Sequence, residues 1–454
     1  MSGLSAAAGA AAGGLGAGRL RAAAGGPGVA VGGPGVAVGG PGVAVCRRGA
    51  AGGVRLLVIV GATLTAGATP AIAAKPPRID AKSAIVVEAS TGQIAYALRP
   101  NERRPIASTT KLMTALLTLE RGGLDDIFTA PPYAADPIES KLGLQTGERM
   151  TARDLLRALL LVSANDGAAD LATGVSGSIP AFVEAMNARA RALGLRDTAY
   201  ANPVGLDDPD NYSTAADLVK LAIVLRRNRF FRETTDLERT RLRSGVRPRT
   251  IVNRNELLAQ SPEVDGVKTG YTSSAGYVLV GSATHNGVTV VSAVLGEPSK
   301  AARNADSLAL LRYGLSQFRQ ATPVRRGARL ATTKVKYRNQ DTIALVAAAG
   351  VRRVVRRGAP VRVAVVGVPG QLEGPLGAGT RAATAVVSVS GRVIARVPVV
   401  TALAVPEVGI GERALAFVRK PGSLVVIGAL LACLALILLR SRRRRHRATE
   451  SEPA

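Results

Sequence analysis

An uncharged apolar run close to the C-terminus limits what the rest of the chain can be. Residues 423–439 are seventeen positions without a charge, which is near the lower limit for a helix that crosses a membrane. Six arginines follow within the last fifteen residues. Because basic residues stay on the cytoplasmic side of a span, the run predicts a transmembrane helix with a basic cytoplasmic tail, 440–454. The alternative is a buried core helix, which the arginines disfavour.

The N-terminal part of the chain predicts export. Residues 1–53 are rich in Gly and Ala and contain three copies of GGPGVAV, a low-complexity composition that is typical of disorder. Residues 54–73 follow a pair of arginines, hold an apolar stretch and end in an A-x-A cleavage signal. This order predicts a secretory signal peptide, with an uncleaved anchor as the alternative. The predicted location is the cell membrane, single-pass, with the part of the chain between signal peptide and span on the extracytoplasmic side.

Cysteine and histidine are scarce, and this scarcity excludes several chemistries. Of two cysteines, Cys46 precedes the signal sequence and Cys433 lies in the predicted span, so the exported part has no disulfide and no thiol nucleophile. Of two histidines, His446 lies in the tail and His285 lies in a predicted turn. A histidine zinc site and a Ser-His-Asp triad therefore lack their residues. We expect no metal and no cofactor.

The formal net charge of +27 is compatible with two kinds of anionic partner, a nucleic acid and an anionic envelope surface. No nucleic-acid-binding motif is present, and aromatic residues make up only 3% of the chain, which leaves little for bases to stack on. We expect no nucleic-acid partner. A basic stretch between Arg325 and Arg362 is hypothesised to orient the protein on anionic wall polymers or lipid head groups, against the alternative of a solvated charged face.

The periodicity of apolar residues predicts an α+β domain over residues 74–325. Two early strands and a late pair joined by His285-Asn286-Gly287, a strong hairpin signal, enclose several amphipathic helices, so we expect a mainly antiparallel sheet with a helical cluster. Short β-rich runs then predict a small all-β domain over 326–410. The expected strands are 83–87, 93–95, 277–284, 288–295, 342–347, 360–366, 383–389 and 393–400, and the expected helices are 108–119, 152–163, 179–193 and 215–226.

Three short motifs could carry chemistry. Ser108-Thr109-Thr110-Lys111 is the only S-x-x-K of the chain, and helical spacing puts Lys111 on the same face as Ser108. A serine at a helix start is also a common N-cap, so this motif alone is weak evidence. Ser163-Ala164-Asn165 follows an apolar helix and could be a plain polar helix end. Lys268-Thr269-Gly270 precedes the hairpin and could be a turn with a solvated lysine.

Together and in this order, the three motifs resemble the signature of penicillin-binding proteins and serine β-lactamases. The segments at 104–114, 202–207 and 265–272 are similar to those of the low-molecular-weight D-alanyl-D-alanine carboxypeptidases, and so is the layout of signal peptide, catalytic domain, small β domain and membrane anchor. The resemblance covers about residues 80–405. It implies removal of the terminal D-alanine from peptidoglycan stem pentapeptides through an acyl-enzyme, with β-lactams as inhibitors and no cofactor.

The resemblance also implies a role for each motif residue. Ser108 is the expected nucleophile and Lys111 its base, which must be neutral, so that burial and the nearby Lys268 are expected to lower its pKa. Ser163 is the expected proton relay.

The remaining motif residues are expected to bind the substrate. Asn165 is expected to hold its amide, and Lys268 and Thr269 its terminal carboxylate. Gly270 lets the strand approach the substrate, and the backbone N–H of Tyr271 completes an oxyanion hole with that of the nucleophile.

Four other functions stay open at this point. A class A-like β-lactamase needs a glutamate after the second motif, and none lies between Glu184 and Glu233. A D,D-transpeptidase or endopeptidase of the same fold shares the acylation step. A non-catalytic β-lactam or muropeptide sensor calls for a larger cytoplasmic domain than fifteen residues. A basic scaffold protein would not need Ser108.

Overall fold

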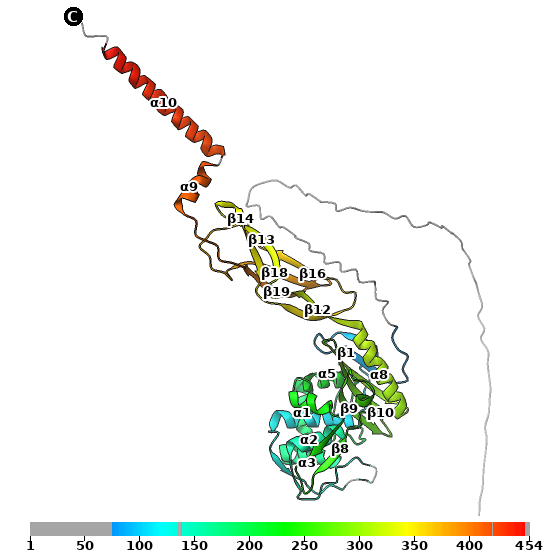
Figure 1. The fold of residues 1–454 in the computed structure, drawn as a ribbon. Coiled ribbons are helices and arrows are strands. Elements are labelled where there is room, and N and C mark those ends of the chain that lie inside the picture. Colours follow the sequence, from blue (N-terminus) through cyan, green and yellow to red (C-terminus); the bar gives the residue numbers. More distant parts are fainter. Residues whose placement is uncertain (1–74, 135, 137–138, 420, 450–454) are drawn as a thin grey trace, which may run out of the picture. The chain divides into compact units, whose positions relative to one another are not determined.

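The structure is a computed structural model that describes residues 75–449, with gaps at 135, 137–138 and 420 (Figure 1). The predicted low-complexity segment 1–53 and signal peptide 54–73, with Cys46, lie outside the described residues. The predicted fold class is confirmed. An antiparallel sheet with helices on its two faces is followed by an all-β part and a C-terminal helix.

The first sheet has five strands in the order β2-β1-β11-β10-β9, and every neighbouring pair is antiparallel. Four of these strands were predicted, and the hairpin turn carries positive φ at Asn286 and Gly287, 47° and 74°, as a two-residue turn of this kind requires. The edge strand β9 was not predicted. The strands are β1 (Ser83–Glu88), β2 (Ile94–Leu98), β9 (Val264–Thr272), β10 (Gly276–His285) and β11 (Val288–Glu297).

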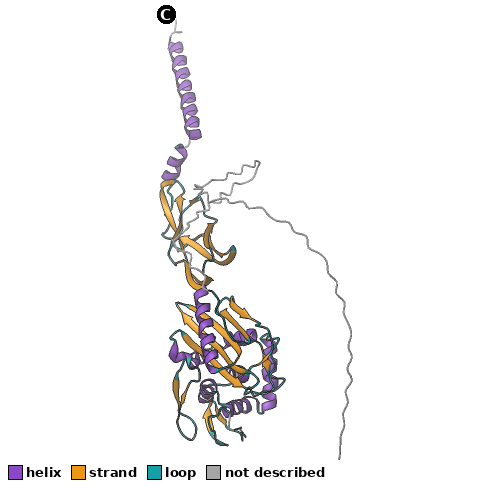
Figure 2. Ribbon diagram, turned by 90° about the vertical axis from the view of Figure 1, so that its right-hand side faces the viewer, coloured by secondary structure: helices purple, strands orange, loops and turns teal. Residues whose placement is uncertain are grey.

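Both faces of this sheet are covered, because alternate residues of each strand enter two different cores. In β11, Val290 and Val294 pack into one core with Leu310 and Leu311 of helix α8 (Lys300–Gln317). Val291 and its alternate neighbours enter the larger core on the opposite face, with the helical cluster. Figure 2 shows the helices on the two sides of the strands. This double cover explains why every residue of β1 is buried.

The helical cluster contains the four predicted helices and two that were not predicted. The expected helix at 108–119 begins with a 3₁₀ turn, η1 (Ala107–Thr110), before the α-helix proper. Helix α3 was missed because its sequence, NDGAADLATGVS, has glycines and aspartates of low helix propensity, and burial holds it in place. The helices are α1 (Lys111–Arg121), α2 (Ala152–Leu161), α3 (Asn165–Ser176), α4 (Ile179–Ala192), α5 (Ala215–Leu225) and α6 (Arg229–Thr235).

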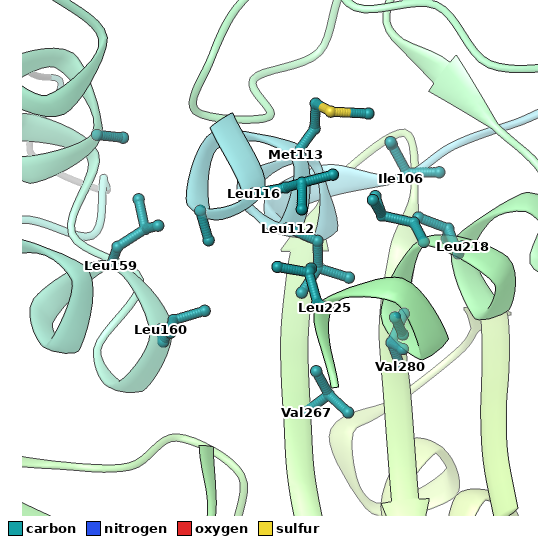
Figure 3. Close-up of a cluster of buried hydrophobic side chains, with 14 of the residues drawn as sticks. Ile106, Leu112, Met113, Leu116, Leu159, Leu160, Leu218, Leu225, Val267 and Val280 are labelled. Carbon is teal, nitrogen blue, oxygen red and sulfur yellow. The ribbon is translucent and has the colours of Figure 1, made fainter. Parts of the chain in front are cut away.

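The larger core fixes α1 against the sheet. Figure 3 shows Leu112 of α1 and Leu225 of α5 pointing toward Val267 of β9 and Val280 of β10. All four side chains are at most 1% exposed. Burying aliphatic side chains of this size stabilises a fold by about 1.5–3 kcal/mol each. The start of α1, which carries Ser108 and Lys111, is therefore held beside β9, which carries Lys268.

The following part is all-β, as predicted. A six-stranded sheet has the order β16-β18-β19-β14-β13-β17, and β12 pairs separately with β15. Its core consists of small apolar residues such as Ala385, Val387 and Val399, in keeping with the scarcity of aromatics. The strands are β12 (Phe318–Val324), β13 (Arg329–Val335), β14 (Arg338–Ala347), β15 (Val351–Arg356), β16 (Val361–Val366), β17 (Gln371–Leu372), β18 (Arg381–Val389) and β19 (Arg392–Thr401).

Two helices end the described chain. Helix α9 (Ile410–Val418) precedes α10 (Pro421–Thr449), and α10 contains the stretch Gly422–Arg442, of 21 residues and mean hydropathy 2.8. By length and composition this stretch is able to cross a membrane, and it includes the predicted span 423–439.

A buried ion pair ties the residues before β5 (Arg149–Thr151) to β8 (Arg249–Val252). Nη1 and Nη2 of Arg249 lie 2.7 and 2.9 Å from the two carboxylate oxygens of Glu148, whose side chain is 0% exposed. The same carboxylate accepts the backbone N–H groups of Gln145 and Val246. Burial acts to raise the pKa of Glu148, but these hydrogen bonds hold it below its ordinary value.

We predict that Arg249→Ala lowers the free energy of unfolding by about 3–5 kcal/mol, because it leaves a buried carboxylate without its partner. Arg229→Ala is the matched control. It breaks an exposed pair with Glu233, and exposed pairs contribute little to stability because water and salt screen them. Urea unfolding followed by circular dichroism measures both. Because the pKa of Glu148 is lower in the folded than in the unfolded state, its carboxylate stabilises the fold fully above the unfolded-state pKa. This stabilisation is lost as pH falls through the folded-state pKa. Equal losses for the two variants would contradict the prediction.

Candidate active site

Ser108 lies in the 3₁₀ turn that opens α1, where its hydroxyl is not used as a helix cap. Neither η1 nor α1 has a side-chain hydrogen bond at its N-cap, so the capping alternative is not realised. Instead, Oγ of Ser108 lies 3.1 Å from Nζ of Lys111, which donates to it. The structure therefore brings these two predicted site residues together, with the hydroxyl half-buried.

Lys111 is fully buried and is held by a neighbouring loop. Its Nζ also donates to the carbonyl of Val204. This loop approaches α1 closely because residue 205 is glycine with φ +85°, and a Cβ there would lie 2.1 Å from the carbonyl oxygen of Ala107. Thr114 Oγ1 donates to the carbonyl of Pro203 at 2.7 Å. The segment at 202–207, singled out by resemblance, thus forms one wall around the Lys111 amine.

Burial is the main reason that Lys111 is a weak base. Desolvation lowers the pKa of Lys111 to about 7, while the Glu139 carboxylate raises it and the Arg254 guanidinium lowers it further. From the sequence we expected the Lys268 cation to lower the pKa of Lys111 as well. In the structure, the cation that lowers it is the Arg254 guanidinium. Near neutral pH a large fraction of Lys111 is therefore the free amine, which can accept a proton.

The motif Lys268-Thr269-Gly270 lies within the edge strand β9, not in a turn. Lys268 is buried, its Nζ donates to the carbonyl of Thr269 at 2.9 Å, and its pKa is lowered well below the ordinary value by burial and by the nearby Lys111 cation. A Cβ on Gly270 would lie 3.0 Å from the backbone nitrogen of Ser108. The absence of a side chain therefore lets β9 pass directly beside the Ser108 turn.

Tyr271 follows this motif at the exposed side of the sheet. It is 55% exposed, and its ring lies 4.4 Å from that of Tyr277 between centroids. The edge strand β9 thus presents an aromatic pair next to the motif.

The motif Ser163-Ala164-Asn165 links α2 to α3. Ser163 has φ +63°, an uncommon conformation for a residue with a side chain, and its buried Oγ has no hydrogen-bond partner among the described residues. Asn165 is the first residue of α3, not the end of a helix, and its Nδ2 donates to a Glu139 oxygen at 2.6 Å. No hydrogen bond joins Ser163 to Lys111 in the described part of the chain.

Sequence reasoning missed Glu139, whose carboxylate accepts from Asn165 and, at 2.7 Å, from the Tyr133 hydroxyl. The segment that follows Glu139 is held on α3 by Asp166, which accepts the backbone N–H groups of residues 142–144. No local pattern marks Glu139, because its role depends on contact with Asn165, which lies 26 positions later. Glu139 precedes the second motif, whereas the β-lactamase pattern calls for a glutamate after it.

Known protein families match the two parts of the chain separately. The profile of the family described as D-alanyl-D-alanine carboxypeptidase matches residues 70–299, and that of the penicillin-binding protein 5 C-terminal domain matches 318–407. The D-alanyl-D-alanine carboxypeptidase DacF of Bacillus subtilis is 32% identical over 328 residues, which are 70% of this chain and 84% of DacF.

Two solved structures are similar as well. Penicillin-binding protein 5 of Haemophilus influenzae is 30% identical, with a TM-score of 0.55 over 74% of this chain and 100% of that one. The Streptomyces K15 DD-transpeptidase is 32% identical, with a TM-score of 0.51 over 54% of this chain and 100% of that one. The predicted family is confirmed: this chain belongs to the serine-type D-alanyl-D-alanine carboxypeptidases, the low-molecular-weight penicillin-binding proteins.

Proposed function

We propose that Ser108 performs the carboxypeptidase reaction of this family, with Lys111 as its base. The observation that carries the proposal is the 3.1 Å contact between the Ser108 hydroxyl and a fully buried amine whose pKa is lowered to about 7. The neutral amine takes the hydroxyl proton while Oγ attacks the carbonyl of the penultimate D-alanine. The resulting tetrahedral intermediate expels the terminal D-alanine and leaves an ester on Ser108, which water then hydrolyses.

Protonation of the leaving amine needs a route from Lys111. We assign this role to Ser163, because its buried hydroxyl has no hydrogen-bond partner among the described residues and is able to accept one proton and donate another. The uncommon φ of Ser163 supports a functional reason for its position, since such backbone strain clusters at active sites.

Substrate binding is assigned to β9 and to the start of α3. Lys268 and Thr269 would receive the terminal carboxylate. Because burial has already lowered the pKa of Lys268, an arriving carboxylate would favour its protonated form. Asn165 would hold the substrate amide through its Oδ1, which accepts no hydrogen bond from the residues that the structure describes. Gly270 leaves room for the peptide, and the N–H groups of Tyr271 and Ser108 would bind the oxyanion.

A transpeptidase is the second candidate, because the K15 DD-transpeptidase covers this chain's catalytic part at 32% identity. The two reactions share the acyl-enzyme and differ in whether water or an amine attacks it. β-Lactams, which the family binds, would acylate the same Ser108.

We also propose how the chain is organised at the membrane. The catalytic domain would lie outside, anchored by a span within Gly422–Arg442, with the arginine-rich tail in the cytoplasm. Because β12 pairs with β15, we place the start of the β domain at Phe318 rather than at residue 326.

We predict that Ser108→Ala abolishes D-alanine release from a diacyl-D-Ala-D-Ala peptide, with a loss of about 10⁴-fold or more as for other nucleophile deletions. The same variant should form no penicilloyl adduct by mass spectrometry. Ser388→Ala, the same change in the β domain, is the control and should keep both activities. An adduct that still forms on Ser108→Ala would assign the nucleophile elsewhere, and release of the acyl group to an added amine would favour the transpeptidase.

We predict that acylation by penicillin increases with pH through about 7, because Lys111 must lose its proton before it can act as a base. Glu139 raises the pKa of Lys111, so Glu139→Gln should move this increase to lower pH while keeping an acceptor for Asn165. Glu120→Gln removes the same charge from the far end of α1, where Glu120 pairs with Arg189, and should not move it. Stopped-flow acylation rates against pH provide the measurement. An unchanged profile for Glu139→Gln would contradict the assigned electrostatic contact.

A further inference from the structure

The positive charge of this protein is concentrated in its C-terminal β domain, residues 318–407. This domain has 15 Lys and Arg against 3 Asp and Glu, an excess of 12, whereas residues 75–317 have 30 against 26, an excess of 4. A domain of 90 residues with so few acids repels itself. The excess therefore needs a reason beyond the solubility of the domain.

Most of these basic residues are exposed and have no ion-pair partner in the part of the chain that the structure describes. Among the residues that the structure describes, only Lys336 and Arg338 of this domain form salt bridges. The other thirteen basic residues are exposed, and none lies within ion-pair distance of a described carboxylate. They are Arg319, Arg325, Arg326, Arg329, Lys334, Arg352, Arg353, Arg356, Arg357, Arg362, Arg381, Arg392 and Arg396.

Strand register places some of these arginines on a common surface. Arg362 of β16 pairs with Ser388 of β18, and Val386, two residues away on the same face, pairs with Arg396 of β19. The opposite face of β18 is buried in the domain core, so Arg362 and Arg396 both face outward. Strand β12, which pairs with the arginine-rich β15, also contacts β16. The exposed arginines of β15 and β16 thus lie on two strands that both contact β12.

The residue type indicates the chemistry of the partner. Twelve of the thirteen unpaired side chains are arginine and one is lysine. A guanidinium offers a planar fork of donors that matches phosphate oxygens and is less strongly hydrated than an ammonium. A surface of this kind favours a phosphate-rich anionic partner over a single carboxylate.

The chain length to the anchor indicates which phosphates lie within reach. Sixteen residues separate Val405, which still pairs with Leu376, from Gly422, where the membrane-spanning stretch begins. Nine of them form α9, so the connection extends at most about 40 Å. The tether keeps the domain at high local concentration beside lipid head groups.

We propose that the β domain docks on the anionic phospholipid head groups of the membrane in which the chain is anchored, through the outward face that holds Arg362 and Arg396 together with the exposed arginines of β15, Arg352 and Arg353. This proposal rests on the proposed topology, in which the domain lies outside the membrane. Docking would hold the catalytic domain at a defined orientation above the lipid surface, whereas a free tether would let it tumble.

The test uses the full chain inserted through its C-terminal helix into vesicles of phosphatidylcholine, with or without phosphatidylglycerol. Phenylglyoxal modifies arginines, and mass spectrometry gives the rate at each position. We expect Arg352, Arg353, Arg362 and Arg396 to react about fivefold more slowly with phosphatidylglycerol present, the factor that corresponds to about 1 kcal/mol for a basic residue near an anionic surface. High salt should remove the protection. Exposed catalytic-domain arginines, such as Arg191, Arg227, Arg241 and Arg247, should react equally in both vesicles.

Two double charge-reversal variants test whether the protection depends on the basic surface of the β domain and not on a change in folding. Arg362→Glu with Arg396→Glu should remove the protection of Arg352 and Arg353, while Arg227→Glu with Arg241→Glu should keep it. Both should still form the penicilloyl adduct, which separates a failure of this proposal from a failure of the proposed catalytic role of Ser108. Equal rates in the two vesicles, or equal protection of the catalytic-domain arginines, would overturn the proposal. Protection by soluble poly(glycerol phosphate), without an effect of phosphatidylglycerol, would assign the surface to a wall polymer and would also overturn it.

Discussion

The burial of two lysine amines in one site is the constraint on which this structure depends. Lys111 and Lys268 are each at most 1% exposed, and each donates to a hydroxyl or a carbonyl, not to a carboxylate. A charged amine in such a place costs several kcal/mol, so burial favours the neutral form, in which an amine is able to accept a proton. The core around Leu112 and the close approach of the backbone at Gly205 and Gly270 bury these amines. The same packing that stabilises the fold therefore lowers the pKa on which the proposed mechanism depends.

The features that depend on short spacing could be predicted from the sequence. Ser108 and Lys111 meet because three residues of helical rise bring them to one face, and Asn286-Gly287 forms its hairpin turn because the turn geometry depends on those two residues. The small residues of the C-terminal part predicted a β core without aromatics. In each case the relevant interaction lies within a few positions along the chain.

The features that depend on distant contacts could not be predicted. Strand β9 is stabilised by pairing with β10 and by Val267 in the core, and its sequence contains two glycines that argue against a strand. Helix α3 has poor intrinsic propensity and is held by burial. Glu139 reaches Asn165 from a segment with no regular structure. This acidic group beside Lys111 precedes the second motif in the sequence, so no local pattern predicts it.

The net charge of each domain is more informative than the net charge of the whole chain. A net charge of +27 first suggested either a nucleic acid or an envelope partner, and composition alone could weigh only the aromatics against the former. Once strands assign residues 318–407 to one domain, the excess of 12 belongs to a surface that has no catalytic group. The proposed mechanism does not use that charge, because the two lysines that it assigns, Lys111 and Lys268, lie buried in the catalytic part of the chain. We propose an external anion as the partner of these exposed arginines, and lipid phosphates would be the nearest ones to a domain tethered about 40 Å or less from the candidate membrane span.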